Sequence, residues 1–413
     1  MTSSLGQGAM AHPGASGSSR RLFISTGDVS GDLQGALLIE ALVQRGLDRG
    51  LTLDITALGG PRMAQAGATL IGDTTAIGSV GIFEALPYVL PNIRLQRQAK
   101  QYLKANPPDL VVMIDNMVPH LALGKYLKQV YPQVPVVYYI APQQWVWAFS
   151  SKDTEQLVAQ CDRMLAIFKA EVDYYQGFGA TTTWVGHPLV DRYPAPADQA
   201  TARQQLGLEL ETLVVTLLPA SRRQEVKYLM PVLLQAAQII QAQCPEVTFL
   251  LPLSIPALQA SFEQGLASHG IQGRVVTEGS QAAIAAADVA ITKSGTANLE
   301  IALMDVPQVV AYRINPLSAR IGYYLLKFDV PYVSPVNLVV NQPVVPEFLQ
   351  WQATPEAIAA AALDLLQNEA ARQTMRAGYA KMRAELGPPG ACQRTADLIL
   401  EALVEGAGAE PSG

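Results

Sequence analysis

The sequence predicts an α/β protein with two Rossmann-like, doubly wound domains that face each other across a cleft. Short apolar or β-branched runs alternate with helix-like segments, which is typical of parallel sheets covered by helices on both faces. The alternation breaks at the proline-containing stretch 192–198, which suits an interdomain hinge, and then restarts. With 413 residues, the chain is long enough to form two hydrophobic cores.

The predicted strands follow one another in two groups. In the first half we predict strands at 22–26, 54–58, 110–115, 136–140, 164–167 and 183–185. Helical segments such as 37–49 and 121–131 lie between several of them. In the second half we predict strands at 213–218, 247–253, 274–277, 289–292 and 309–312, and helices at 355–367, 370–386 and 392–404.

These elements define the predicted domain boundaries. The first domain spans 21–191 and the second spans 192–388. A C-terminal helix follows at 389–404, and its packing against the first domain stays open. We expect residues 1–20 and 405–413 to be disordered. The N-terminal stretch is rich in Gly, Ser and Ala and lacks the basic and apolar blocks of a signal peptide.

Composition excludes several classes of protein. A net charge of −6 gives no reason to expect nucleic acid as a partner. Three widely spaced cysteines exclude a disulfide framework and suit a reducing cytoplasm. The uncharged stretch 228–244 does not indicate a membrane span, because Gln235, Gln238 and Gln241 recur at helical spacing and form a polar face.

The segment 294–300 carries the clearest functional signal. It follows a predicted strand and opens a predicted helix, where free backbone N–H groups and the helix dipole favour an anion. Ser294 and Thr296 add hydroxyl groups, and Gly295 lets the backbone approach a phosphate closely. Glu300 lies about one turn further on, where a carboxylate can accept both ribose hydroxyls. This pattern suits the diphosphate and ribose of a nucleotide sugar, with an ordinary helix N-cap as the alternative.

The turn after the first predicted strand contains Asp28, Ser30 and Asp32. Its position is that of a phosphate loop, but it matches neither a dinucleotide fingerprint nor a Walker A motif. Two carboxylates also argue against phosphate binding. We therefore assign these three residues to a hydroxylated acceptor, and an N-cap role for Ser30 or Asp32 remains the alternative.

Three further residues, Asp115, His187 and Arg222, are candidates for catalysis. Asp115 ends a buried predicted strand, where side chains face the crevice of such a sheet, and is a candidate general base. His187 precedes the hinge and could transfer a proton, with a structural role as the competitor. Ser221 and Arg222 follow the first strand of the second half, where a guanidinium can bridge a leaving diphosphate. The chain has no D-x-D pair, so we predict no metal and no other cofactor.

Together these segments resemble the lipid-A-disaccharide synthase family, whose members are inverting glycosyltransferases of the two-domain GT-B type. The resemblance extends from about residue 22 to residue 400. The segments that carry it lie at 27–32, 79–84, 114–115, 138–142 with Trp145 and Trp147, 186–191, 218–222, 294–300 and 345–347.

The resemblance implies transfer of 2,3-diacylglucosamine from its UDP ester to 2,3-diacylglucosamine 1-phosphate, without a metal. It implies Asp115 as the base, Arg222 as an arginine needed for activity, 294–300 as the UDP site and Glu84 on the acceptor side. The expected location is the cytoplasm, with peripheral attachment to the inner leaflet of the inner membrane. No nucleic acid partner is expected, and a homodimer stays open.

The chain also departs from the family pattern at Asp28, Val118, Phe149, Ala220 and 341–343. These departures bear on acceptor specificity more than on the UDP site. Two alternatives therefore stay open: an enzyme that resembles UDP-N-acetylglucosamine epimerases, and a non-catalytic relative that binds UDP or lipid.

Overall fold

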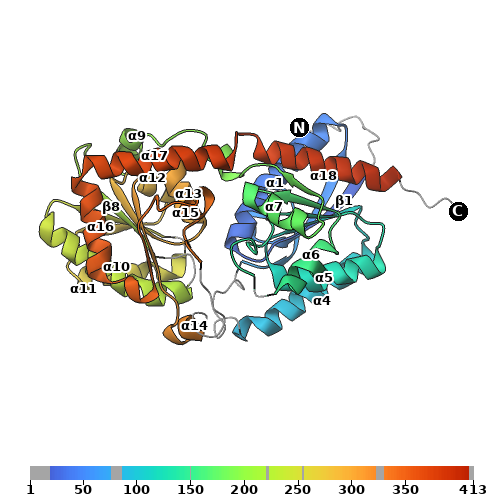
Figure 1. The fold of residues 1–413 in the computed structure, drawn as a ribbon, viewed down its shortest axis with the longest axis horizontal. Helices are drawn as coiled ribbons and strands as arrows, with labels where there is room; N and C mark the ends of the chain where they lie inside the picture. Colours follow the sequence, from blue (N-terminus) through green and yellow to red (C-terminus); the bar gives the residue numbers. More distant parts are fainter. Residues whose placement is uncertain are drawn as a thin grey trace, which may run out of the picture.

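The computed structural model describes residues 19–75, 86–148, 150–219, 223–253, 255–321 and 330–408. Two α/β domains lie side by side, and a long C-terminal helical segment runs along both of them (Figure 1). The prediction of two doubly wound domains is therefore confirmed.

The first domain is built on a seven-stranded sheet in which all neighbouring strands are parallel. Its strands lie in the order β3-β2-β1-β4-β5-β6-β7. They are β1 (Ser19–Ser25), β2 (Thr52–Gly59), β3 (Thr69–Asp73), β4 (Leu110–Ile114), β5 (Val136–Tyr139), β6 (Arg163–Ala166) and β7 (Thr182–Trp184). The helices are α1 (Val29–Asp48), α2 (Pro61–Gln65), α4 (Val89–Ala105), α5 (Met117–Val130), α6 (Ser151–Val158), α7 (Lys169–Gly177) and α8 (Leu189–Arg192).

The second domain has a six-stranded parallel sheet in the order β10-β9-β8-β11-β12-β13. Its strands are β8 (Val214–Leu218), β9 (Thr248–Pro252), β10 (Gly273–Val276), β11 (Val289–Lys293), β12 (Gln308–Tyr312) and β13 (Glu347–Leu349). Its first helices are α9 (Gln199–Gln205), α10 (Arg223–Gln243), α11 (Gln259–Ser268), α12 (Ser280–Ala285) and α13 (Thr296–Leu303). They are followed by α14 (Pro316–Arg320), α15 (Pro335–Val340), α16 (Pro355–Gln367), α17 (Glu369–Leu386) and α18 (Ala391–Gly408).

Strand order sets the position of the site. In each sheet the order reverses at one point, between β1 and β4 in the first domain and between β8 and β11 in the second. Loops that leave such a point diverge to opposite faces and open a crevice at the carboxyl ends of the strands. The turns that carry Asp28, Asp115 and Ser294 all leave strands at these two points.

Both faces of the first sheet are buried, which explains why its strands could be recognised. Every residue of β4 is buried. Val111 and Met113 face one hydrophobic core, while Val112 and Ile114 face the other. A parallel strand covered on both faces is therefore apolar throughout, and every predicted strand overlaps an observed one. Two strands, β3 and β13, were not predicted, because they are only partly buried.

The uncharged stretch 228–244 belongs to α10 up to Gln243 and is amphipathic. Leu233 and Ile240 are fully buried, whereas Gln238 is exposed and its amide donates to the carbonyl of His269 at 2.8 Å. Within the described ranges, no helix combines the length and the hydropathy needed to cross a membrane.

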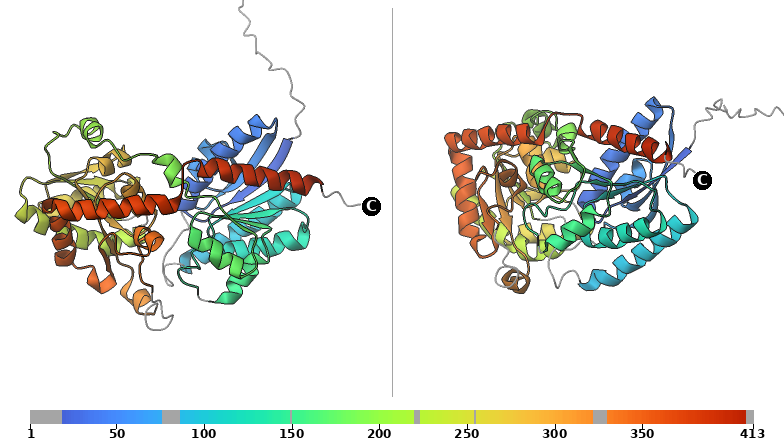
Figure 2. Two further views of the ribbon diagram at one scale, coloured as in Figure 1. Left: turned by 45° about the horizontal axis from the view of Figure 1, so that its top comes forward. Right: turned by 45° about the vertical axis from the view of Figure 1, so that its right-hand side comes forward.

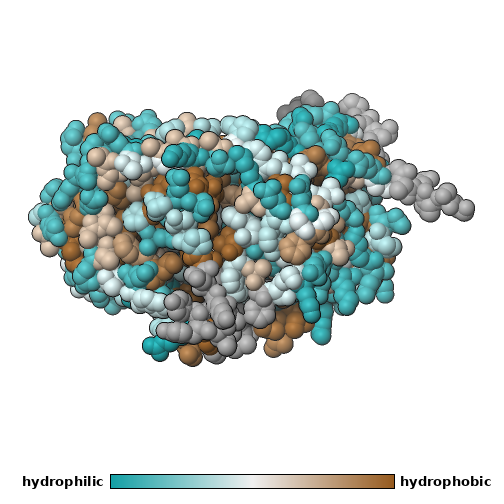
Figure 3. Space-filling view, viewed as in Figure 1, coloured by the Kyte–Doolittle hydropathy of each residue, from teal (hydrophilic) through white to brown (hydrophobic). Residues whose placement is uncertain are grey.

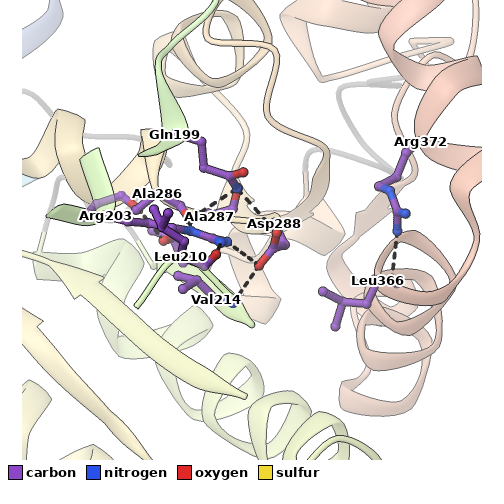
Figure 4. Close-up of polar contacts among 11 residues, drawn as sticks. Gln199, Arg203, Leu210, Val214, Ala286, Ala287, Asp288, Leu366 and Arg372 are labelled. Carbon is purple, nitrogen blue, oxygen red and sulfur yellow. Dashed lines mark hydrogen bonds and ion pairs between the residues drawn. The ribbon is translucent and has the colours of Figure 1, made fainter. Parts of the chain in front are cut away.

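The first connection between the domains is short, because α9 is bound to the second domain by hydrogen bonds and an ion pair. Arg203 on α9 forms an ion pair with Asp288 at 2.8 Å, and Asp288 also accepts from the backbone N–H of Val214 (Figure 4). Gln199 donates to the carbonyl of Ala287 at 3.0 Å. The free length of this connection is therefore confined to about residues 193–197.

The chain returns to the first domain through 387–390, and α18 packs against α1 (Figures 1 and 2). Asp397 of α18 forms ion pairs with Arg45 and Arg49 of α1, each at 2.7 Å. At the start of α18, the Asp191 carboxylate accepts backbone N–H groups of 390–392 at 2.5 to 3.2 Å. The two connections between the domains are thus joined by hydrogen bonds.

Candidate functional site

A cleft of about 1580 Å³ lies between the two domains, at the carboxyl ends of the strands. Residues from both reversal points line it, including Asp28 and Asp115 from the first domain and the whole segment 292–297 from the second. Trp147, Phe168 and Trp351 add aromatic surface to the lining. The cleft is large enough for a ligand of the size of a nucleotide sugar.

The loop before α13 has a conformation that brings its backbone close to the cleft. Gly295 is the N-cap residue and has φ 142°, which other residues rarely adopt. Asn298 is fully buried, accepts from the Gly295 N–H at 3.0 Å and donates to the Lys293 carbonyl at 2.8 Å. The two hydrogen bonds of the buried Asn298 side chain therefore fix the conformation of this loop. The Ser294 hydroxyl donates to the carbonyl of Val333 at 2.8 Å, so its oxygen remains able to accept.

Ser30 and Thr296 meet across the cleft, although they are 266 positions apart in the sequence. Their hydroxyl oxygens lie 2.9 Å apart, and both residues line the cleft. Ser30 lies in the first turn of α1, and Thr296 is the first residue of α13. The predicted acceptor loop and the predicted nucleotide loop therefore adjoin each other.

Glu300 lies half-buried in the lining, one turn into α13. The Tyr193 hydroxyl donates to its Oε1 at 3.3 Å. Burial raises the pKa of Glu300, and the positive charges of Arg192 and Arg62 oppose that rise. Arg62 comes from the first domain, so cations from two parts of the chain lie near this carboxylate.

Asp115 does not continue β4 as predicted; the strand ends at Ile114. Asp115 and Asn116 both have left-handed backbones, with φ of 52° and 56°, which turns the Asp115 side chain out of the sheet. Asp115 is exposed and lines the cleft, and its Oδ1 accepts from the Asn116 N–H at 2.8 Å. Gly27 makes room for this turn, since a Cβ there would meet the Asn116 side chain at 2.0 Å.

The two carboxylates near the start of α1 have different surroundings. Asp28, which lines the cleft, is the N-cap residue of α1 and accepts from the Gly31 N–H at 2.9 Å. Asp32 is buried, and its oxygens accept from the N–H groups of Arg62 and Met63, which caps α2. The alternative N-cap role for Ser30 or Asp32 on α1 was wrong, because Asp28 takes it. Asp32 serves the fold and does not line the cleft, which argues against its predicted contact with the acceptor.

His187 belongs to the lining of the cleft, but its side chain is almost entirely buried. Its Nδ1 accepts from the Leu189 N–H at 3.2 Å, and its ring lies 5.2 Å from that of Phe168. Burial lowers the pKa of His187 to about 3. A histidine with this pKa stays neutral near pH 7 and is a weak base, so the structure argues against the predicted proton transfer by His187.

The buried histidines make stability depend on pH. Burial lowers the pKa of His187 to about 3, whereas an unfolded histidine has a pKa of about 6.5. Below pH 6.5 the unfolded chain therefore binds a proton that the folded chain does not, and the free energy of unfolding decreases as the pH is lowered. In His187→Asn we expect the drop in unfolding free energy from pH 7 to pH 4.5 to be about 2 kcal/mol smaller than in the parent. Urea titrations would measure it, with half-exposed His269→Asn as the control; equal drops in His187→Asn and the parent would contradict the expectation.

Three predicted site residues, Glu84, Ser221 and Arg222, lie outside the described residues, as do Phe149 and Ala220, where the chain departs from the family pattern. Other residues in the lining were not predicted. Lys293 ends β11, and its Nζ lies 3.5 Å from where a Cβ on Gly295 would be. Arg62 and Arg192 are the other cations in the described lining. A basic residue directly before a phosphate-type loop is a signal that could have identified Lys293.

No group of three or more His, Cys, Asp or Glu side chains that could hold a metal ion occurs within the described ranges of the structure. The described lining brings a helix N-terminus, carboxylates and cations together on the walls of one cleft. Such a site can bind a diphosphate, position a sugar and accept a proton.

Comparisons with known proteins agree with this geometry. The family model described as lipid-A-disaccharide synthetase matches residues 22–402. The lipid-A-disaccharide synthase of Gloeothece citriformis is 50% identical over 92% of this chain and 99% of its own length. That of Geobacter sulfurreducens is 36% identical over 93% of this chain and 98% of its own length.

Solved structures with low sequence identity share the fold. The UDP-GlcNAc 2-epimerase from Neisseria meningitidis, solved with UDP-GlcNAc, has a TM-score of 0.57 at 10% identity and covers 94% of this chain and 100% of its own. The glycotransferase of kitacinnamycin has a TM-score of 0.59 at 17% identity and covers 93% of this chain and 99% of its own. Transferases and epimerases therefore share this two-domain fold, and the fold alone does not distinguish them.

Proposed function

Since the chain belongs to the lipid-A-disaccharide synthetase family, we propose that it transfers 2,3-diacylglucosamine from its UDP ester to 2,3-diacylglucosamine 1-phosphate. The products are the β-1,6-linked disaccharide 1-phosphate and UDP, in the biosynthesis of lipid A. The observation that carries the proposal is the cleft in which Asp115 from the first domain and the segment 292–297 from the second line opposite walls.

On the donor side, we assign the diphosphate to the N-terminus of α13. Gly295 and Thr296 present the backbone there, and Ser294 supports the loop. Ser221 and Arg222, outside the described residues, belong to the same proposal. Lys293 lies beside the loop and adds positive charge. Glu300 would accept the ribose hydroxyls, because it lies one turn further along the same helix.

On the acceptor side, Asp115 would remove the proton from the 6-hydroxyl. The hydroxyl oxygen then attacks C1 of the donor sugar, the bond from C1 to the diphosphate oxygen breaks, and that oxygen keeps the electron pair. UDP gains negative charge in this step, and a helix N-terminus with nearby cations stabilises it. Asp28, Ser30 and Glu84 remain candidates for contact with the acceptor, with Asp28 and Ser30 in the described lining.

One assay tests the proposed reaction directly. The protein is incubated with UDP-2,3-diacylglucosamine and 2,3-diacylglucosamine 1-phosphate, and the products are analysed by mass spectrometry. We expect the disaccharide 1-phosphate to form only when both substrates are present. Formation of free UDP without disaccharide, or of an epimerised UDP-sugar, would contradict the proposal. Binding of UDP without any conversion would indicate the non-catalytic alternative.

We also propose that the protein attaches peripherally to the inner leaflet of the inner membrane. The segment 318–328 combines Arg320 and Lys327 with aromatic and aliphatic residues, a mixture that suits a membrane interface. The structure describes it only up to residue 321, and Arg320 is exposed there. A second candidate surface is the start of α4, where Val89, Leu90 and Ile93 are 47%, 66% and 42% exposed. Figure 3 shows hydrophobic residues at the surface in this region. Exposed apolar side chains beside cations suit an interfacial surface.

This proposal predicts binding to vesicles that depends on salt. Vesicles with an anionic lipid should retain the protein in a flotation assay at low salt, and roughly 1 M salt should release much of it, because salt screens attraction between exposed charges. Leu90→Ser should weaken binding at every salt concentration, because it removes apolar contact. Exposed Leu210→Ser, in the second domain, is the matched control. Binding that is unchanged by salt would contradict the electrostatic contribution.

A further inference from the structure

The backbone of Asp115 is held at both of its polar groups. Its N–H donates to the Ile140 carbonyl at 2.9 Å, and its carbonyl accepts from the Tyr138 hydroxyl at 2.5 Å. Asp115 and the following residue, Asn116, both adopt left-handed conformations. Residues without glycine's freedom keep such conformations only where surrounding contacts enforce them.

The Tyr138 hydroxyl is the end of a buried chain of polar groups. His120 Nδ1 lies 3.0 Å from the Tyr138 hydroxyl oxygen, and His120 Nε2 lies 2.9 Å from Ser25 Oγ. Ser25, His120 and Tyr138 are at most 2% exposed. They come from β1, α5 and β5, which are the strands beside β4 and the helix that follows it.

The donors and acceptors available on these side chains allow only one direction of proton donation along the series Ser25, His120 and Tyr138. Tyr138 has a single hydroxyl proton, which it donates to Asp115, so its oxygen accepts from His120 Nδ1–H. His120 Nε2 then accepts from the Ser25 hydroxyl. Burial lowers the pKa of His120 to about 4, and burial raises that of Tyr138 well above its usual value. Both groups therefore stay neutral near pH 7, and the direction is maintained.

We propose that Tyr138, supported by His120 and Ser25, is a positioning residue that locks the left-handed turn at Asp115 and so aims its carboxylate into the cleft. The proposal rests on the proposed role of Asp115 as the base. Rates depend steeply on the placement of a base, and a displacement of about 1 Å can cost on the order of 100-fold. Tyr138 itself touches neither substrate, because it is absent from the lining of the cleft.

Tyr138→Phe removes only the hydroxyl and should show this role in the kinetics. We expect kcat to fall roughly tenfold, within the range that misplacement of a base produces. The KM for the donor and the affinity for UDP should stay within about twofold of the parent, because the donor site lies on the other domain. A kcat equal to that of the parent would overturn the proposal.

The matched control is Tyr379→Phe. Tyr379 is 2% exposed, and its hydroxyl also donates to a backbone carbonyl, that of Val306 at 3.1 Å, but in the second domain. Both substitutions should lower the midpoint of urea unfolding, and Tyr379→Phe should keep the parent kcat in buffer without urea. A similar loss of kcat in both variants would mean that general loosening of the fold explains the effect, and the proposal would fail.

A double-substitution cycle tests whether Tyr138 acts through Asp115. In an Asp115→Asn background the base is already lost, so Tyr138→Phe should change the residual rate less than twofold. An equal factor in both backgrounds would show that Tyr138 acts independently of Asp115 and would contradict the proposal.

A structural measurement separates this inference from the proposed reaction. In a crystal structure of Tyr138→Phe, we expect the Asp115 backbone to leave the left-handed region or to occupy more than one conformation. A single, unchanged left-handed Asp115 would overturn the positioning role even if the parent makes disaccharide. If the parent makes no disaccharide, the proposed reaction fails, and the conformation of Asp115 in this variant still decides the inference.

Discussion

Replacing Asp115 with Asn should slow disaccharide formation at least about 100-fold, with little change in the affinity for UDP. Asn keeps the shape of the side chain and removes its basicity, and general base catalysis typically contributes 10²- to 10⁴-fold. Asp115 is exposed in the cleft at the strand reversal of the first sheet. Because it stands on the opposite domain from the α13 loop, binding of UDP should hardly depend on it.

Steady-state kinetics at saturating donor and acceptor would measure this effect, with UDP affinity measured separately by calorimetry. Asp173→Asn, at an exposed position on α7, is the matched control and should behave like the parent. Near-normal turnover in Asp115→Asn would contradict the assignment of the base. His187 would not be a simple replacement, since its pKa of about 3 leaves it a weak base.

Replacing Glu300 with Ala should weaken UDP binding by roughly 1.5–3 kcal/mol, the usual range for a charge-assisted hydrogen bond. The KM for the donor should rise by the factor that corresponds to this loss of binding free energy. Turnover at saturating donor should fall much less, because the ribose contacts exist both before and after transfer and are therefore uniform binding. This pattern is the reverse of the one expected for Asp115→Asn, and the two variants together separate donor binding from chemistry.

2′-Deoxy-UDP provides an independent measure of the same contact. The parent should bind it more weakly than UDP, because one ribose hydroxyl is missing, and Glu300→Ala should discriminate less between the two. Glu401→Ala, at an exposed position on α18, is the control. If the parent binds both nucleotides equally well and Glu300→Ala leaves UDP affinity unchanged, the nucleotide does not lie where we propose.

Most strands could be predicted from the sequence for a physical reason. A strand in a doubly covered parallel sheet buries both faces and can therefore be apolar throughout, as β4 is. The same reasoning fails for β3 and β13. Both are partly exposed and carry no continuous apolar run, and neither was predicted. The helices at 355–367 and 370–386 were predicted within one residue at either end, because polar caps and prolines mark their ends.

The candidate site was predictable where function follows from position along the chain. In parallel sheets every strand points its carboxyl end towards the same edge, so residues directly after strands gather there. Asp28, Asp115 and the segment 294–300 satisfy this condition, and all line the cleft at least in part. Asp32 does not follow a strand directly, and the described structure argues against its assignment to the acceptor, as it does against proton transfer by His187.

Local sequence thus determined the fold class, the succession of strands and helices along the chain, and the segments that could line a cleft. It did so because burial and turn formation depend on neighbouring residues. Tertiary structure decided what individual polar groups do, because their partners are distant in sequence. Asp32 caps α2 about 30 positions away, Ser30 meets Thr296 across 266 positions, and burial lowers the pKa of His187 to about 3. The Tyr138 hydroxyl reaches the Asp115 carbonyl only because β4 and β5 pair side by side. No pattern in a single sequence records such pairings, since each depends on how two separate segments pack.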